Sequence, residues 1–132
     1  MTVPRPIVGV VDDDESVRES LPDMLRELGY APRAFASAEE FLASDCISDT
    51  RCLILDIAMP GMSGPELHRE LVLRGHKIQV IFITALADPG LRRRVLQEGA
   101  VACLSKPFSE QDLRDALAAG LPGRGAAEVL VR

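Results

Sequence analysis

The sequence predicts an α/β fold with a doubly wound, five-stranded parallel sheet. Short runs rich in Val, Ile, Leu and Phe alternate five times with longer stretches of helical periodicity, which is typical of a parallel sheet with helices packed on it. All but the second run lack the apolar–polar alternation of a half-exposed strand, so we expect both faces of the sheet to be covered. The five expected strands are Ile7–Val11, Ala31–Phe35, Cys52–Asp56, Gln79–Thr84 and Ala102–Ser105.

The first expected helix covers Ser16–Leu28, where apolar residues fall on one helical face. Gly29 follows directly and favours a helix stop. Pro22 lies in the middle of this pattern, where a proline removes a backbone hydrogen bond and crowds the preceding turn. We therefore expect a kink at Pro22. The alternative is a helix that starts near Pro22 after an irregular turn.

The other four helices are marked at their N-termini. Ser37 with two following glutamates predicts a short second helix. Pro65 and Pro89 suit the first turns of the third and fourth helices. Ser109 with Asp112 forms a capping-box pattern at the start of the fifth.

Length and composition indicate one domain with one core. The chain has 132 residues, enough for a single domain of ordinary size. The composition changes after Leu121, so we expect a domain over residues 1–121 and a linker or C-terminal tail over residues 122–132. No helix-turn-helix pattern follows the last expected helix, and we expect any output domain to lie outside this chain.

Charge, hydropathy and cysteine usage narrow the class of protein. A net charge of −5 provides no basic surface for direct nucleic-acid binding. The longest apolar runs are far shorter than the ~20 residues that span a bilayer, and no signal-peptide pattern opens the chain. Cys46, Cys52 and Cys103 have no close spacing, which favours reduced thiols. We expect a soluble cytoplasmic protein without membrane contacts.

Polar side chains stand at the ends of four expected strands. Asp12 and Asp13 follow the first, Asp56 ends the third, Thr84 ends the fourth and Lys106 follows the fifth. Doubly wound sheets bind ligands at the carboxyl ends of their strands. If the strand order is 2-1-3-4-5, the first and third strands are neighbours about 4.8 Å apart. Three carboxylates then share one small pocket.

Such an acidic cluster is unfavourable unless a cation enters it. Oxygen ligands with room for water suit Mg²⁺ or Mn²⁺ better than zinc. The three negative charges are balanced by one divalent ion together with Lys106, which leaves a neutral pocket able to receive a phosphoryl group.

Each of these residues also has an ordinary structural interpretation. Asp12 to Glu15 could offset the dipole at a helix N-terminus, Asp56 could begin a loop, Thr84 could cap a helix, and Lys106 could be a solvated surface charge. Their joint occurrence at the ends of four of the five expected strands favours a functional site.

The polar strand ends lie within longer motifs that resemble a known family. In chain order the motifs are Val11-Asp12-Asp13, the run from Asp56 to Gly64 with Met59, Pro60 and Met62, Thr84-Ala85, and Lys106-Pro107-Phe108. Over about residues 5 to 120 the chain resembles the receiver domains of two-component response regulators. Glu39–Leu42 and Gly99-Ala100 are similar to receivers that precede helix-turn-helix output domains. The resemblance implies a flavodoxin-like (βα)₅ fold.

The resemblance also implies a role for each motif residue. A sensor histidine kinase or a phosphotransfer protein would phosphorylate Asp56 in a Mg²⁺-dependent (or Mn²⁺-dependent) reaction. The ion would be bound by Asp13, Asp56 and the backbone carbonyl of Ala58, with Asp12 acting through a water molecule. Thr84 and Lys106 would bind the phosphoryl oxygens, and the Lys106–Pro107 peptide bond would be cis.

Signal output would follow from a movement at the phosphorylated site. Thr84 and Lys106 would be drawn toward the phosphoryl group and would shift the face formed by the fourth helix, the fifth strand and the fifth helix. That face would contact a downstream target or a second copy of the chain. Arg92 to Arg94 lie on the fourth helix as docking charges or, alternatively, as a solvated surface. The domain would catalyse only its own phosphorylation and dephosphorylation, and is not expected to be an enzyme.

Two departures from the family pattern affect switching and lifetime. Cys103 stands where the family has an aromatic switch residue. Coupling to the output face is then weaker or carried by other residues, unless Cys103 is simply a small core residue. Ala58 and Leu86 stand where the family often has polar side chains that orient water. We expect a long-lived phosphorylated form.

The sequence argues against three alternative functions. A phosphatase of the haloacid dehalogenase type needs a second carboxylate two residues after its nucleophile, where this chain has Ala58. A flavin- or dinucleotide-binding domain would need a glycine-rich fingerprint after the first strand or more aromatic residues. A receiver-like module that is never phosphorylated would not need the full set of Asp12, Asp13, Asp56, Thr84 and Lys106.

Overall fold

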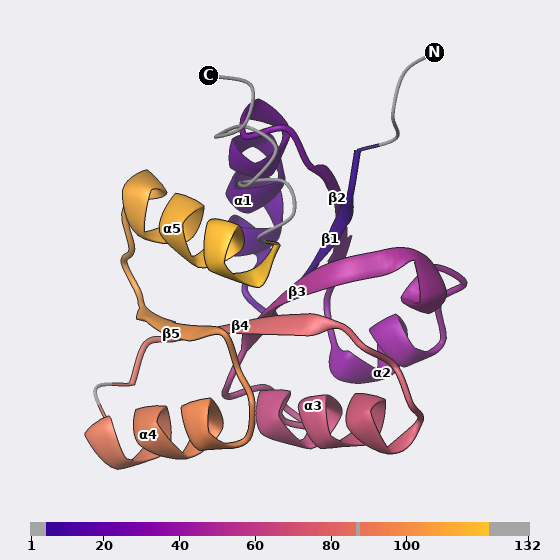
Figure 1. Ribbon diagram of the computed structural model, residues 1–132, viewed down its shortest axis with the longest axis vertical. Coiled ribbons are helices and arrows are strands. Elements are labelled where there is room, and N and C mark those ends of the chain that lie inside the picture. The colour runs from indigo at the N-terminus through magenta and orange to yellow at the C-terminus, as the bar shows by residue number, and fades with distance from the viewer. Residues whose placement is uncertain (1–4, 87, 122–132) are drawn as a thin grey trace.

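The structure of the protein is a computed structural model that describes residues 5–86 and 88–121 (Figure 1). The expected tail over residues 122–132 lies outside the described residues. Strands and helices alternate in the described part, with a short 3₁₀ turn, η1, at Ile47–Asp49. The strands are β1 Ile7–Val11, β2 Ala31–Phe35, β3 Thr50–Asp56, β4 Gln79–Thr84 and β5 Ala102–Ser105. The helices are α1 Glu15–Glu27, α2 Ala38–Leu42, α3 Gly64–Leu73, α4 Pro89–Gln97 and α5 Glu110–Gly120.

The five strands form one parallel sheet in the order β2-β1-β3-β4-β5. This confirms the doubly wound fold and the strand order expected from the sequence. Helices α1 and α5 cover one face, and α2, α3 and α4 cover the other (Figure 1). The order in which successive strands are added to the sheet reverses between β1 and β3, which is where a sheet of this kind places its functional loops.

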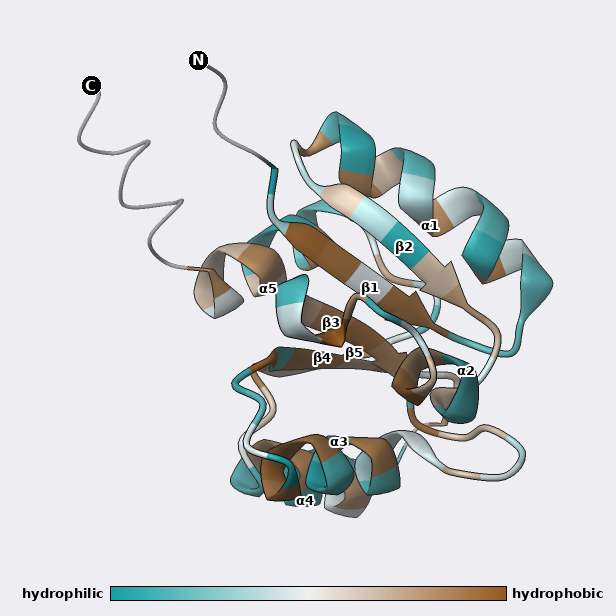
Figure 2. Ribbon diagram, turned by 90° about the vertical axis from the view of Figure 1, so that its right-hand side faces the viewer, coloured by the Kyte–Doolittle hydropathy of each residue, from teal (hydrophilic) through white to brown (hydrophobic). Residues whose placement is uncertain are grey.

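Each face of the sheet has its own hydrophobic core. Val10 and Ile54 of the sheet pack with Leu25 of α1 and other residues of α1 and α5. Leu53 packs on the opposite side with Phe41 of α2 and residues of α3 and α4. Brown apolar segments therefore run through the central strands, while the helices show teal outward faces (Figure 2). Continuous apolar strands are required because both faces of β1, β3 and β4 are covered.

The edge strand β2 and helix α1 explain two local features of the sequence. Arg33 and Ala34 of β2 are exposed, since this strand lies at the edge of the sheet, and its weaker apolar pattern reflects that position. Helix α1 begins at Glu15 and contains Pro22 as a buried residue. The alternative of a helix that starts near Pro22 is therefore wrong, whereas the kink stays a prediction.

Strand β3 starts earlier than the apolar pattern of the sequence predicts. The strand begins at Thr50, two residues before Cys52. Thr50 is buried, and its hydroxyl donates a hydrogen bond to the Cys46 carbonyl at 2.8 Å. A local side-chain bond of this kind allows a polar residue to enter a buried strand, which an apolar pattern does not reveal.

The cysteines form no disulfides, and no described helix has the character of a membrane span. Cys46, Cys52 and Cys103 are free and buried, and burial raises the pKa of Cys52 to about 12. Among the described residues, no helix combines the length and apolar character needed to cross a membrane.

Candidate functional site

The parallel pairing of β1 with β3 creates an acidic pocket at the carboxyl edge of the sheet. Val11 pairs with Leu55, so Asp12 and Asp56 extend from neighbouring strands at the same level. Asp13 joins them from the β1–α1 loop. One carboxylate oxygen of each of the three residues lies within 4.8 Å of the others. The structure thus brings together the three carboxylates that the sequence predicted to converge.

Asp12 is the most completely enclosed of the three. Its side chain is fully buried, and Oδ1 accepts a hydrogen bond from the backbone N–H of Asp14 at 2.9 Å. Its backbone carbonyl accepts a hydrogen bond from Nη1 of Arg18 at 2.9 Å. Because a buried carboxylate needs hydrogen bonds and a counter-charge, these contacts fix Asp12 at the base of the pocket.

Lys106 supplies the counter-charge from the loop after β5. Its ammonium donates a hydrogen bond to Oδ2 of Asp12 at 2.8 Å, and lies 3.7 Å from Oδ1 of Asp56. Burial alone would lower the pKa of Lys106, but the hydrogen bond to Asp12 and the charge of Asp56 raise it overall. The peptide bond between Lys106 and Pro107 is cis. Lys106 is therefore positively charged and within reach of both buried carboxylates.

The surroundings of Asp56 disfavour its ionised form. Burial and the charge of Asp12 together raise the pKa of Asp56 to about 7, although the charge of Lys106 offsets part of the rise. A carboxylate must be ionised to act as a nucleophile. A divalent cation at the pocket would favour the ionised form by direct attraction.

The donor set fits a hard cation. Asp12, Asp13 and Asp56 offer carboxylate oxygens, and the side chain of Asp13 is exposed and accessible from solvent. Oxygen-only ligands with space for water molecules suit Mg²⁺ or Mn²⁺. Ala58 follows in the exposed part of the loop after β3, where its carbonyl is a further available oxygen.

The acidic residues that follow β1 have two different roles. Asp14 is the N-cap of α1, and its Oδ1 accepts a hydrogen bond from the backbone N–H of Ser16 at 2.9 Å. Glu15 lies in the first turn of that helix. The structural interpretation therefore holds for Asp14 and Glu15, whereas Asp12 and Asp13 face the pocket with Asp56.

Thr84 ends β4 on the opposite side of Asp56 from β1. Asp56 pairs with Ile83, so buried Thr84 lies one residue beyond it along the neighbouring strand. The Thr84 hydroxyl accepts a hydrogen bond from the backbone N–H of Leu86 at 2.9 Å. In this structure the Thr84 hydroxyl is thus hydrogen-bonded to the backbone of the loop that follows β4. Leu86 itself is about half exposed, at 52 %.

Two residues that support the pocket were missed by sequence reasoning. Gly64 begins α3 directly beneath Asp56, and an added Cβ there would lie 2.3 Å from the Asp56 carbonyl oxygen. Glu39 of α2 accepts a hydrogen bond from the backbone N–H of Met62 at 3.0 Å, which ties α2 to the β3–α3 loop. The sequence shows Gly64 only as part of a motif, and Glu39 only as an acidic residue at a helix start and within the Glu39–Leu42 resemblance. Neither pattern reveals a tertiary contact.

The family of the chain follows from comparison with known proteins. The family model of the response regulator receiver domain matches residues 8–118, which include every residue of the acidic pocket and Lys106. This chain belongs to the response regulator receiver domain family. The general function of such receiver domains is to accept a phosphoryl group in two-component signalling, generally with Mg²⁺ bound at an acidic pocket.

Relatives of this receiver domain are longer proteins. It is 44% identical over 115 residues to nodulation protein W of Bradyrhizobium diazoefficiens, covering 87% of this chain and 51% of that protein. It is 40% identical over 114 residues to the transcriptional regulatory protein TdiR of Thauera aromatica, covering 86% and 50%. The chain therefore spans about half the length of the curated relatives that it matches.

Solved structures show the same fold. The response regulator StyR has 42% identity and a TM-score of 0.81, with coverage of 96% of this chain and 66% of that one. FixJ-N has 37% identity and a TM-score of 0.78, with coverage of 91% and 94%. The receiver domain described here therefore has the architecture of its relatives.

Proposed function

We propose that Asp56 is the phosphoacceptor of this receiver domain. The observation that carries the proposal is the convergence of Asp12, Asp13 and Lys106 on the buried Asp56 carboxylate. A phosphohistidine on a sensor kinase or a phosphotransfer protein is the proposed donor. A buried aspartate that faces a cationic side chain and two further carboxylates suits transfer of a metal-bound phosphoryl group better than it suits a structural role.

The proposed transfer is a single displacement at phosphorus. An Asp56 carboxylate oxygen attacks the phosphorus and forms an O–P bond, while the P–N bond to the donor imidazole breaks. The electron pair of that bond stays on the imidazole nitrogen, which takes a proton from solvent. Lys106 has three N–H donors. One holds Asp12, and another can bind a phosphoryl oxygen. The Thr84 hydroxyl accepts a hydrogen bond from Leu86 and keeps its own proton, so it can be a second donor.

Asp13, Asp56 and the carbonyl of Ala58 would hold Mg²⁺ (or Mn²⁺), with Asp12 acting through a water molecule. When bound, the ion neutralises charge on the transferred group and orients it. Asp12 also keeps Lys106 in place. The residues of this chain therefore position the phosphoryl group, whereas the donor supplies the reactive bond.

The catalytic role would be limited to the chain's own phosphorylation and dephosphorylation. The side chain two residues after Asp56 is that of Ala58, which cannot act as the second carboxylate of a phosphatase. The intact set of pocket residues supports phosphorylation over a module that only binds partners.

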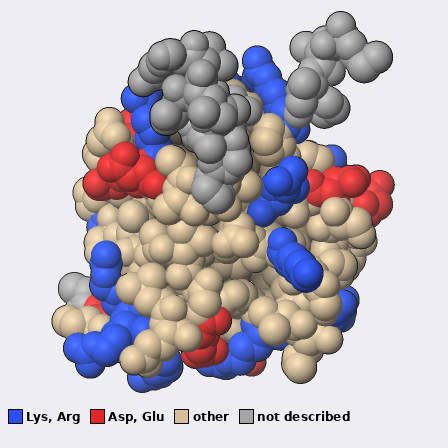
Figure 3. Space-filling model, viewed as in Figure 1, with Lys and Arg blue, Asp and Glu red and all other residues tan. Residues whose placement is uncertain are grey.

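Output would pass through the face formed by α4, β5 and α5. Basic side chains gather over the part of the surface where α4 lies (Figure 3), and Arg92, Arg93 and Arg94 of that helix are exposed. These charges suit docking of an acidic target surface, which can be an output domain, a separate protein or a second copy.

Residues 1–121 would form the receiver module and residues 122–132 a linker or tail. The names of relatives such as TdiR support transcriptional control as the output.

Intact-mass measurement tests the proposal. The protein is mixed with acetyl phosphate and Mg²⁺, and the mass of one added phosphoryl group is expected. Asp56→Asn should abolish the increase, whereas Asp45→Asn, on the exposed loop after α2, should not. An unchanged increase in Asp56→Asn would contradict the assignment, and chelation of the metal should remove the increase from the unaltered protein.

A further inference from the structure

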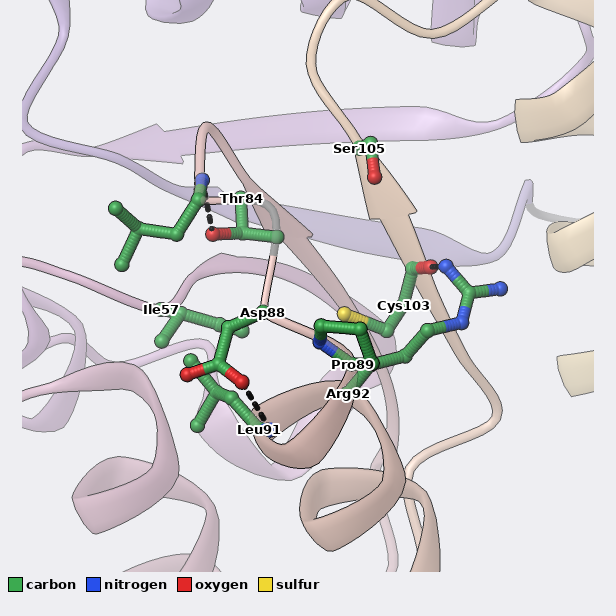
Figure 4. Close-up of a pocket in the computed structure, with 9 residues that line it drawn as sticks. Ile57, Thr84, Asp88, Pro89, Leu91, Arg92, Cys103 and Ser105 are labelled. Carbon is green, nitrogen blue, oxygen red and sulfur yellow. Dashed lines mark hydrogen bonds between the residues drawn. The ribbon is translucent and has the colours of Figure 1, made fainter.

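A cavity of about 240 Å³ lies beside Thr84, between the start of α4 and the ends of β4 and β5. Buried walls are formed by Ile57, Thr84 and Cys103. In Figure 4 the sulfur of Cys103 points between Ile57 and Pro89, into the space that these side chains surround. The remaining lining residues are Leu86, Asp88, Pro89, Leu91, Arg92 and Ser105.

The two charged side chains at the cavity have partners within the protein. Arg92 donates a hydrogen bond from Nη1 to the Cys103 carbonyl at 2.6 Å. Oδ1 of Asp88 accepts hydrogen bonds from the backbone N–H groups of Gly90 and Leu91 at 3.0 and 3.2 Å. Both charges are therefore engaged within the protein, and a neutral ligand leaves these interactions undisturbed.

The interior offers apolar surface with few polar atoms. Burial raises the pKa of the Cys103 thiol, so the thiol is neutral at pH 7 and presents a soft, weakly polar surface. The Thr84 hydroxyl already accepts a hydrogen bond from Leu86 and retains its proton as a donor. Ser105 carries a second hydroxyl at the rim. The lining therefore suits an apolar body with one hydrogen-bond acceptor.

The size of the cavity sets the size of the ligand. An engineered apolar cavity of about 150 Å³ binds benzene, so 240 Å³ accommodates a six-membered ring with a short substituent. Exposed Leu86 and Pro89 form its rim, which gives a ligand a path from solvent. The Cys103 side chain is too small to fill a space of this size, so the cavity is open to a ligand.

We propose that this cavity is a binding site for a compact neutral molecule of up to about ten non-hydrogen atoms, scaled from the benzene-sized case, with a ring-sized apolar body and one acceptor group. The acceptor group takes a hydrogen bond from Thr84 or Ser105, and the ring packs against Ile57, Leu91 and the Cys103 sulfur. The proposal does not depend on phosphorylation of Asp56.

Benzyl alcohol is a suitable probe because it has one ring and one hydroxyl. The isotope-labelled chain is titrated with it in the absence of phosphodonor, and NMR shifts are followed for Thr84, Leu91 and Cys103. We expect saturable shifts confined to the cavity residues. Intermolecular NOEs from the ring protons to methyl groups of Ile57 and Leu91 are expected in the same sample.

Three variants locate the site. Cys103→Phe fills the cavity and should weaken binding at least tenfold, whereas Cys103→Ser keeps the space and should retain binding. Leu73→Phe adds the same ring at a side chain that is 82% exposed on α3, and should also retain binding. Linear, non-saturating shifts with no NOEs in the unaltered protein would overturn the proposal, as would binding to a folded Cys103→Phe at unchanged affinity. The NOE result decides the matter if Cys103→Phe does not fold.

Discussion

The Lys106 ammonium is hydrogen-bonded to Asp12 at 2.8 Å. It stands farther from Asp56, at 3.7 Å, so its main partner in this structure is the fully buried carboxylate next to the proposed phosphoacceptor. The ion pair neutralises Asp12 without occupying both oxygens of Asp56. Asp56 thereby keeps an oxygen for the reaction while lying within range of a positive charge.

Lys106→Gln should separate metal binding from phosphorylation. Removal of the ammonium leaves three carboxylates without their cation, so the affinity for Mg²⁺ should rise by about tenfold from the lost repulsion. The rate of phosphorylation by acetyl phosphate should fall by about a hundredfold, because a charged donor to the phosphoryl oxygens is lost. Metal titration and intact-mass kinetics measure the two effects. Lys77→Gln, at an exposed position, is the control, and a parallel loss of both properties would contradict this role of Lys106.

The stability of the metal-free protein should depend on the charge of Asp56. Its pKa is raised to about 7 from an unfolded value of 3.8, so between these values the folded chain holds the proton more tightly than the unfolded chain. The contribution is fully present below pH 3.8 and is lost as the pH rises through about 7. The loss amounts to at most about 4 kcal/mol.

Asp56→Asn should remove this part of the pH dependence and should stabilise the metal-free protein at pH 8. Urea unfolding in a chelator at pH 5 and pH 8 measures the free energy of unfolding for both chains, with Asp45→Asn as the surface control. Addition of Mg²⁺ should restore stability to the unaltered protein at pH 8 more than to Asp56→Asn. Equal pH slopes for the two metal-free chains would show that Asp56 does not titrate in this range.

Gly64→Ala should disturb the site through the backbone. The added methyl group would lie 2.3 Å from the Asp56 carbonyl oxygen, so α3 or the end of β3 has to move. We expect a loss of about 1–3 kcal/mol in the free energy of unfolding and slower phosphorylation. Gly90→Ala is the matched control in the first turn of α4, where the nearest atom is a side-chain oxygen of Asp88 at 3.3 Å. If both variants unfold at the same denaturant concentration, close packing under Asp56 is not important for stability.

The phosphorylated form should be long-lived. Ala58 and Leu86 are exposed beside the pocket, and neither side chain can orient a water molecule for attack on the acyl phosphate. Ala58→Asn should therefore shorten the lifetime, whereas Ala118→Asn, on the exposed surface of α5, should leave it unchanged. Intact-mass spectra after removal of acetyl phosphate follow the decay. A half-life of seconds for the unaltered chain with Mg²⁺ would defeat this expectation.

Much of the fold and the acidic pocket was predictable because each depends on a regular pattern. Continuous apolar runs identified β1, β3 and β4 as buried strands, and the parallel sheet then required Asp12 and Asp56 to meet at one edge. The polar neighbours were harder to assign. Asp14 and Asp13 are adjacent and chemically identical, yet one caps α1 and the other faces Asp56; the sequence contains no signal that separates them.

The remaining features arise from tertiary contacts between distant segments. The bond from Met62 to Glu39 spans 23 residues and the bond from Arg92 to Cys103 spans 11, and no local periodicity reports either one. The cavity beside Cys103 likewise depends on tertiary packing. The neighbours of a small side chain can close around it, or they can leave an empty space beside it. Only the arrangement of α4 against β4 and β5 decides between these outcomes.

The central claim is that Asp56, and no other carboxylate of the pocket, carries the phosphoryl group. Borohydride reduction of the acyl phosphate converts the modified aspartate to homoserine, and peptide mass spectrometry then identifies its position. After reaction with acetyl phosphate and Mg²⁺, homoserine should be found at position 56 alone. Homoserine at position 12 or 13, or none at all from a protein that has gained the phosphoryl mass, would contradict the account.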